Sequence, residues 1–300
     1  MYDIIIVGAG PAGLTSAIYA SRAKKSVLVL EATTYGGQIV TTLDIENYPA
    51  CMHISGYDFA KKIYEQALEL GAEVKFEKVI DIDNKKDHKE VITEKETYKC
   101  KAIILATGSD NRKLDLENED ELLGKGVSYC ATCDGNFYKK KEVAVVGGGN
   151  TALEEALYMA DIASKVYLIH RRDEFRGANK TINKLKKKEN VEFILNSNVT
   201  KLNGKNKLES IEVTDNNENV KTINVSAVFI AVGRNPENQN FAKIIDLDEH
   251  GYIIASEDCH TNVEGIFVAG DNRVKTVRQL VTAESDGAVA AIEATKYLNK

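Results

Sequence analysis

Tryptophan is absent from this 300-residue sequence, proline occurs three times, and no apolar run approaches the length that crosses a membrane. With so little proline and an ordinary share of apolar residues, the chain is neither collagen-like nor disordered. Cysteine is also scarce. Its five copies are odd in number and include one close pair, which is not the framework of a small secreted protein, so we expect a reducing cytoplasm.

An excess of basic charge is missing as well. The formal net charge is -6 at pH 7, which argues against a general nucleic-acid binder. The sequence opens on MYDIIIVGAG, a strand that begins within three residues and has no basic leader before it, so we expect no secretory signal. The length favours two domains.

A glycine-rich turn lies between a strand and a helix near the start of the chain. The run DIIIVGAGPAGLTSAIYASR passes from β-rich residues into apolar residues at helical spacing. Gly8 permits the tight turn, Gly10 lets the backbone approach a pyrophosphate, and Gly13 lets the helix pack on the strand. Roughly twenty residues later Glu31 ends the strand SVLVLE, where an acid accepts hydrogen bonds from an adenosine ribose. The complete pattern predicts a dinucleotide site.

The same pattern returns in the middle of the chain. KKEVAVVGGGNTALEEALYMADIASKVYLIHRR again runs strand, glycine turn, helix and strand, with Gly147, Gly149 and Ala152 in the three glycine positions. Two nucleotides are therefore expected to bind, one at each turn.

The second strands of the two copies end differently. Glu31 falls opposite His170, which opens the run HRRDEFR. An acid suits free ribose hydroxyls, whereas the guanidinium groups of Arg171, Arg172 and Arg176 suit a 2′-phosphate. We therefore expect FAD at the first turn and NADPH at the second.

Two further strand-like runs, 101–109 and 227–236, end in glycine turns and mark the joints between domains. The predicted fold is α/β, with two doubly wound Rossmann-like nucleotide-binding domains, the second inserted into the first. Residues 1–113 and 238–300 form the discontinuous FAD-binding domain. Residues 114–237 form the NADPH-binding domain, which also carries the close cysteine pair.

The C-terminal part returns to the first domain through GIFVAGD, a strand that ends in Gly270 and Asp271, and then through a helical stretch. Ligands of such sheets bind beyond the carboxyl ends of the strands. Asp271 is therefore expected near the ribityl and phosphate chain of the flavin.

The close cysteine pair lies in CATCDGN. Zinc would need four ligands, and the other cysteines are isolated, although His260 stands beside Cys259. A redox dithiol fits better, because two intervening residues bring the sulfurs of Cys130 and Cys133 within disulfide distance. Asp134 is placed to exchange protons with such a dithiol, and a turn-forming role is equally compatible with the sequence.

CATCDG, the later GGGN and HRRDEFR, the opening GAGPAG and the late FVAGD together resemble the low-molecular-weight thioredoxin reductases of bacteria and archaea, over essentially the whole chain. The resemblance implies a homodimeric, NADPH-dependent FAD enzyme that reduces the disulfide of thioredoxin. Two alternatives stay open. One is a reductase of a glutaredoxin-like or peroxidase-linked disulfide protein, and the other is an NADPH-binding, redox-sensing flavoprotein that does not turn over.

By the same resemblance, Cys133 lies against the flavin, Cys130 attacks the partner's disulfide and Asp134 protonates. The matched FAD contacts are Gly8, Gly10, Gly13, Glu31, Gly37, Gln38, Asp271, Arg278 and Gln279. The matched NADPH contacts are Gly147, Gly149, Asn150, Arg171, Arg172 and Arg176. The sequence departs from the family at Ala50, where a turn glycine is usual, at Cys51 and at Asn136.

Overall fold

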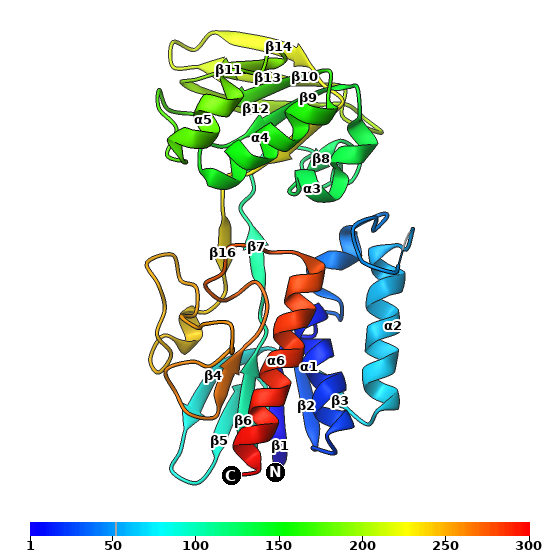
Figure 1. Cartoon of the computed structure of the whole chain (residues 1–300), viewed down its shortest axis with the longest axis vertical. Helices are drawn as coiled ribbons and strands as arrows, with labels where there is room; N and C mark the ends of the chain where they lie inside the picture. The colour runs from blue at the N-terminus through cyan, green and yellow to red at the C-terminus, as the bar shows by residue number, and fades with distance from the viewer. Residues whose placement is uncertain (52) are drawn as a thin grey trace. The chain divides into compact units, whose positions relative to one another are not determined.

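The computed structural model describes residues 1–51 and 53–300, which divide into two compact units. Unit 1 combines Met1–Asp110 with Asn235–Lys300, and unit 2 is the inserted segment Asn111–Arg234 (Figure 1).

Two short strands carry the chain from one unit to the other. They are β7 (Ser109–Asn111) and β16 (Arg234–Pro236), and they pair as a two-stranded sheet. The sequence pattern places the joints a few residues further along, near 113 and 237.

Unit 1 is built on a seven-stranded sheet in the order β3-β2-β1-β6-β5-β4, with β17 also beside β6. The strands β3, β2, β1, β6 and β17 are parallel, whereas β5 and β4 are antiparallel additions. The bounds are β1 (Tyr2–Val7), β2 (Val27–Glu31), β3 (Glu73–Phe76), β4 (Val79–Asn84), β5 (Lys89–Thr93), β6 (Thr97–Leu105) and β17 (Ile266–Val268).

Side chains of the central strands alternate between the two faces of this sheet, as period-2 patterning requires. Ile4 and Ile6 of β1 pack under the helices, and Ile5 points to the opposite face, which is covered by the segment around Phe241 and Ile253. The helices α1 and α6 lie side by side on the first face (Figure 1). The helical bounds are α1 (Pro11–Arg22), η1 (Gly37–Thr41), α2 (Gly56–Glu69), η3 (Gln239–Phe241) and α6 (Leu280–Leu298).

Unit 2 combines a five-stranded parallel sheet, in the order β11-β10-β9-β15-β8, with a three-stranded antiparallel sheet, β12-β13-β14. Val143 and Val145 of β9 pack against α4, while Ala144 and Val146 pack against the antiparallel sheet. The strand bounds are β8 (Val127–Ser128), β9 (Glu142–Val146), β10 (Lys165–Ile169), β11 (Val191–Ile194), β12 (Ser197–Asn203), β13 (Ser210–Asp215), β14 (Val220–Asn224) and β15 (Ala227–Ile230). The helical bounds are α3 (Ala131–Asp134), η2 (Gly135–Tyr138), α4 (Asn150–Ile162) and α5 (Asn179–Leu185).

The predicted α/β class with parallel sheets is confirmed. Helices cover one face of the seven-stranded sheet and of the five-stranded sheet, and strands or loops cover most of the other face. Among the helices of the described residues, none has the length and apolar character needed to span a membrane.

Candidate nucleotide and disulfide sites

The first glycine turn joins β1 to α1, and its packing requires glycine at two positions. Gly8 has φ +107°, and a Cβ there would lie 2.3 Å from the carbonyl oxygen of Ala106, which follows β6. A Cβ on Gly13 would lie 1.9 Å from the carbonyl oxygen of Gly8. Helix and sheet therefore meet through bare backbone at this turn.

Gly10 is different, because its surroundings are open. It is the N-cap of α1, which receives no side-chain cap from the described residues, and a Cβ there would approach only the Cα of Gly37, at 4.0 Å. A second glycine loop, formed by Gly36 and Gly37, therefore lies against the first, and Gly37 has φ +58°. Gln38 anchors this second loop, because its side-chain N–H donates to the carbonyl oxygen of Ser109. An uncapped helix N-terminus lined by glycine fits the pyrophosphate of a dinucleotide.

Glu31, at the end of β2, holds the turn from the other side. Its Oε2 accepts the N–H of Ala9 at 2.8 Å, and its Oε1 accepts the N–H of Thr33 at 2.9 Å. Oε2 retains a second lone pair after this bond. The carboxylate therefore fits the ribose hydroxyl that the sequence assigns to it.

The loop after β17 reaches the same turn. A Cβ on Gly270, at φ +92°, would lie 2.9 Å from the Cβ of Ala12 in α1, so β17 ends against the start of that helix. Arg278 donates to the carbonyl oxygens of Asp271 and Lys275 at 3.3 and 3.1 Å. Its guanidinium thereby fixes the backbone that carries Asp271.

Gln279 begins α6 as its N-cap. Its side chain and that of Thr282 form a reciprocal capping box, and its Oε1 accepts the side-chain N–H of Asn47 at 3.1 Å. Arg278 therefore supports the loop that carries Asp271, and Gln279 caps the helix that follows this loop.

A buried ion cluster under this loop was missed by the sequence reasoning. Asp286 of α6 accepts hydrogen bonds from Arg273 Nε, Lys275 Nζ and the N–H of Gly270 at 2.8, 2.9 and 3.0 Å. Arg273 is 1% exposed and Asp286 is 5% exposed. Burial alone would raise the pKa of Asp286, but the two cations hold it below its ordinary value. No periodic pattern in the sequence links a helical acid to cations in the preceding loop.

Unit 2 repeats the geometry of the first turn. Gly147 has φ +150°, and a Cβ there would lie 2.3 Å from the carbonyl oxygen of Ala231. Gly149 is the N-cap of α4, has no side-chain cap, and no described atom lies within 4 Å of the position of a Cβ. The turn is again closed at its first glycine and open at the helix N-terminus, which fits a second pyrophosphate. Asn150 also shapes it, because its Oδ1 accepts the N–H of Ala178 at 2.7 Å.

The two glycine turns differ in the residues at the end of the next strand, which are Glu31 in unit 1 and His170 with three arginines in unit 2. The ring of His170 packs on Gly148, where a Cβ would lie 2.1 Å from ring Cε1, and burial lowers the pKa of His170. Unlike the buried His170, the three arginines that follow, Arg171, Arg172 and Arg176, are exposed. The backbone N–H of Arg176 donates to the carbonyl oxygen of Gly148 at 2.8 Å. A neutral ring on the turn with exposed guanidinium groups beside it fits an anionic phosphate.

Cys130 and Cys133 are joined in a disulfide at the start of α3, with their Cα atoms 5.3 Å apart. Cys130 is the N-cap of this short helix, and its Sγ accepts the N–H of Cys133 at 3.2 Å. Both residues are half-buried. Sulfurs bonded to each other are in the form that accepts two electrons rather than the thiolate form that binds zinc.

Two carboxyl groups flank the disulfide helix, one half-buried and one buried. Ser128, at the end of β8, donates to Asp134 Oδ2 at 2.6 Å, and burial raises the pKa of Asp134. Glu155 of α4 reaches the other end of the helix, where its Oε1 accepts the N–H of Ala131 at 3.2 Å. The sequence pointed to Asp134 and gave no signal for Glu155.

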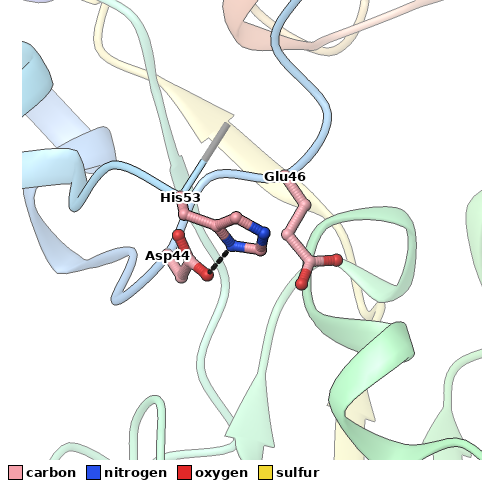
Figure 2. Close-up of side chains that lie close together, drawn as sticks. All are labelled: Asp44, Glu46 and His53. Atoms are coloured by element: carbon pink, nitrogen blue, oxygen red, sulfur yellow. Dashed lines mark hydrogen bonds and ion pairs between the residues drawn. The ribbon is translucent and has the colours of Figure 1, made fainter. Parts of the chain in front are cut away.

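A separate group of potential ligand atoms lies on unit 1. Asp44, Glu46 and His53 place one such atom each within 4.8 Å of one another (Figure 2). His53 Nδ1 lies 2.9 Å from Asp44 Oδ2, and this hydrogen bond raises the pKa of His53, whose side chain is 65% exposed. We interpret the group as an ion pair that closes a surface loop and assign no metal to it.

Comparisons with known proteins show the family to which the chain belongs. A family profile described as pyridine nucleotide-disulphide oxidoreductase matches residues 2–287. A thioredoxin reductase from Listeria innocua is 42% identical over 304 residues, which cover 100% of this chain and 95% of that protein. A bifunctional thioredoxin reductase/thioredoxin from Mycobacterium leprae is 39% identical over 302 residues, which cover 99% of this chain and 66% of that protein. The crystal structure of thioredoxin reductase from Streptococcus pyogenes is 39% identical with a TM-score of 0.95, covering 100% of this chain and 98% of that one.

Proposed function

Because the chain belongs to the pyridine nucleotide-disulphide oxidoreductase family, we propose that it is a thioredoxin reductase, which passes electrons from NADPH through FAD and the Cys130–Cys133 disulfide to oxidised thioredoxin. The disulfide carries the proposal. It is the one cystine among the described residues, and it lies in the same unit as the second glycine turn.

We assign FAD to unit 1 and NADPH to unit 2. The residues proposed to hold FAD are Gly8, Gly10, Gly13, Glu31, Gly37, Gln38, Asp271, Arg278 and Gln279. Those proposed to hold NADPH are Gly147, Gly149, Asn150, Arg171, Arg172 and Arg176. When bound, the flavin supplies the chemistry that links a two-electron hydride donor to a disulfide.

The thiol chemistry belongs to the chain's own residues. In the reduced protein the Cys130 sulfur attacks one sulfur of the partner's disulfide, which forms a mixed disulfide and releases the other partner sulfur as a thiolate. Cys133 then attacks the Cys130 sulfur, so the Cys130–Cys133 bond forms again and the second partner thiolate leaves. Asp134, whose pKa burial raises, is placed to give a proton to a departing thiolate.

Thioredoxin is favoured as the partner over a glutaredoxin-like or peroxidase-linked protein. Its support is the Mycobacterium leprae relative, whose name joins thioredoxin reductase and thioredoxin. The remaining alternative is a redox sensor that does not turn over. The number of partner thiols released per molecule of this protein distinguishes a sensor from an enzyme.

The deciding experiment mixes catalytic amounts of the FAD-loaded protein with NADPH and excess oxidised thioredoxin under anaerobic conditions. The expected result is many thiol pairs released per protein molecule. A single pair per molecule would instead indicate a sensor. Parallel reactions with an oxidised glutaredoxin and a peroxidase-linked disulfide protein, at the same concentrations, test the choice of partner.

We further propose that the chain forms a homodimer through unit 1. Its support is an apolar hollow of about 450 Å³ bordered by α1, α2 and α6, with Ile18, Phe59 and Ile63 in its lining. Beside these, Tyr19 and Val281 are 44% and 42% exposed although both are large and apolar. A second copy would remove this surface from water. Sedimentation equilibrium at micromolar concentration tests the dimer, and a monomer mass would contradict it.

A cytoplasmic location is proposed from the free thiols. Cys51, Cys100 and Cys259 are unpaired cysteines in a fold whose one described cystine is the proposed redox pair. Reducing compartments preserve such thiols. Cell fractionation with immunodetection tests the location.

Replacing Arg171 and Arg172 together with alanine is expected to raise the KM for NADPH by roughly 100-fold and to leave the KM for NADH within about threefold. Each charge-assisted hydrogen bond to a 2′-phosphate contributes roughly 1.5–3 kcal/mol, and NADH has no such phosphate. Steady-state kinetics with both nucleotides measure the effect. A matched control replaces Lys187 and Lys188, which lie after α5. Equal losses with the two nucleotides would assign the arginines a structural role.

A further inference from the structure

Glu155 is a buried acid in an otherwise apolar helix face. It lies on α4 between Ala152 and Met159, which pack into the core of unit 2, and it is 8% exposed. A carboxyl group in such surroundings is costly to bury unless it has a specific partner or holds a proton. The disulfide chemistry described above makes no use of it.

One oxygen of Glu155 has a partner next to the disulfide. Oε1 accepts the N–H of Ala131 at 3.2 Å, and Ala131 is joined through its peptide bond to Cys130. Together with the bond from the N–H of Cys133 to Cys130 Sγ, this contact supplies acceptors to two of the donors at the start of α3. Glu155 therefore holds the backbone from which the Cys130 side chain projects.

The other oxygen is buried and has no hydrogen-bond partner among the described residues. An ionised carboxylate left in this state is unfavourable, whereas a protonated one places a neutral O–H there. The same oxygen is thus the natural position for a proton.

The charges that face Glu155 act in opposite directions. Burial raises its pKa most, the N–H of Ala131 and the cation of Arg234 lower it, and the nearby Asp134 raises it, so that the pKa of Glu155 is raised to about 7. Asp134 itself accepts a hydrogen bond from Ser128. Tyr138 of η2 also lies near Asp134, and its pKa is raised first by burial and then by the charge of Asp134. Near neutral pH the group lies between its two protonation states in the disulfide form.

We propose that Glu155 is a positioning and proton-holding residue that binds a proton when the Cys130–Cys133 disulfide is reduced and releases it when the disulfide forms again. Reduction breaks the S–S bond and adds two electrons, which leaves negative charge on sulfur beside the helix that Glu155 contacts. That charge disfavours a second anion nearby, so a proton from solvent binds to Glu155. Formation of the disulfide removes the charge, and the proton leaves. The electrons are those that the proposed reductase activity delivers, so the inference rests on that function.

The test measures the disulfide equilibrium without any turnover. The FAD-loaded wild type, Glu155→Gln and the exposed neighbour Glu154→Gln are equilibrated in dithiothreitol redox buffers across the neutral pH range, and free Cys130 and Cys133 are trapped by alkylation and counted by mass spectrometry. Glutamine retains an oxygen for the N–H of Ala131 but does not titrate.

The expected result is a change in the ratio of the reduction equilibrium constants, wild type over Glu155→Gln. This ratio is constant well below pH 7 and falls as the pH rises above 7, approaching 10-fold per pH unit where Glu155 is ionised in the disulfide form and protonated in the dithiol form, because the wild type there takes up one additional proton on reduction. The corresponding ratio of wild type over Glu154→Gln is expected not to vary with pH. A Glu155→Gln ratio that does not vary with pH overturns the proposal.

A second measurement does not depend on the folding of Glu155→Gln. Infrared difference spectra of wild type between its disulfide and dithiol forms are expected to show a protonated carboxyl band on reduction that Asp134→Asn retains. Loss of the band in Asp134→Asn, or no band in either protein, overturns the proposal. Neither the redox-buffer measurement nor the infrared measurement uses thioredoxin. A protein that does not reduce thioredoxin would contradict the proposed function, and the role of Glu155 could still be tested.

Discussion

Replacing Cys130 with serine is expected to lower the rate of thioredoxin reduction by at least about 10³-fold, or roughly 4 kcal/mol in the barrier, while NADPH still reduces the bound flavin. A serine hydroxyl is not ionised near neutral pH and forms no bond to sulfur that a second thiol can exchange. The same substitution at Cys133 removes the thiol that resolves the mixed disulfide. Both cysteines lie at the start of α3, where no other described sulfur is bonded to either of them.

The measurement follows thiol release from thioredoxin and flavin absorbance in the same anaerobic sample. Cys51→Ser is the matched control, because Cys51 is a free cysteine of intermediate exposure on unit 1. It is expected to turn over near the wild-type rate. If Cys130→Ser kept its activity and Cys51→Ser lost it, the electron path would run through a different thiol from the one proposed.

Replacing Asp286 with asparagine is expected to lower the free energy of unfolding of unit 1 by about 3–5 kcal/mol. The substitution leaves Arg273 and Lys275 buried without the carboxylate that neutralises both. It also weakens the bond to the N–H of Gly270, which turns the chain against α1. We therefore expect weaker retention of FAD in the same variant.

Denaturant unfolding followed by circular dichroism measures this loss, with the transition of unit 1 analysed separately from that of unit 2. Glu293→Gln is a control on the same helix, because its ion pair with the 65%-exposed Lys296 is worth less than about 1 kcal/mol. A second variant replaces Arg273, Lys275 and Asp286 together with apolar residues of similar volume. It is expected to be more stable than Asp286→Asn, because no uncompensated buried charge is left. Equal stability of Asp286→Asn and Glu293→Gln would contradict the argument.

The cluster also fixes the direction of a pH effect. The folded-state pKa of Asp286 is depressed, so the stability that its ionised form contributes is present above the unfolded pKa of an aspartate and is lost as the pH falls through the folded value. Acid unfolding of unit 1 is therefore expected to shift to a higher pH in Asp286→Asn, which already lacks this contribution.

The sequence by itself determined the two glycine turns between strand and helix and the cysteine pair. Gly8 and Gly147 stand where φ is positive and a Cβ would strike a carbonyl oxygen, and Gly10 and Gly149 stand where the helix N-terminus is open. These requirements are local: they are met within a few residues of strand, turn and helix, so spacing alone reveals them. The same holds for Cys130 and Cys133, whose separation by two residues already permits the bond.

Only the tertiary structure decided which distant residues contact these local elements and how those residues are protonated. His170 covers Gly148, Asp286 neutralises two loop cations, and Glu155 contacts the backbone beside Cys130 although it lies 24 residues beyond Ala131. Each contact joins segments that strand order and helix packing bring together, and neither helical nor strand periodicity distinguishes such an acid from an ordinary polar residue. Burial raises the pKa of Glu155 and lowers that of His170, whereas two neighbouring cations lower the pKa of Asp286. Burial and close charges are properties of the packed chain rather than of any short stretch of it.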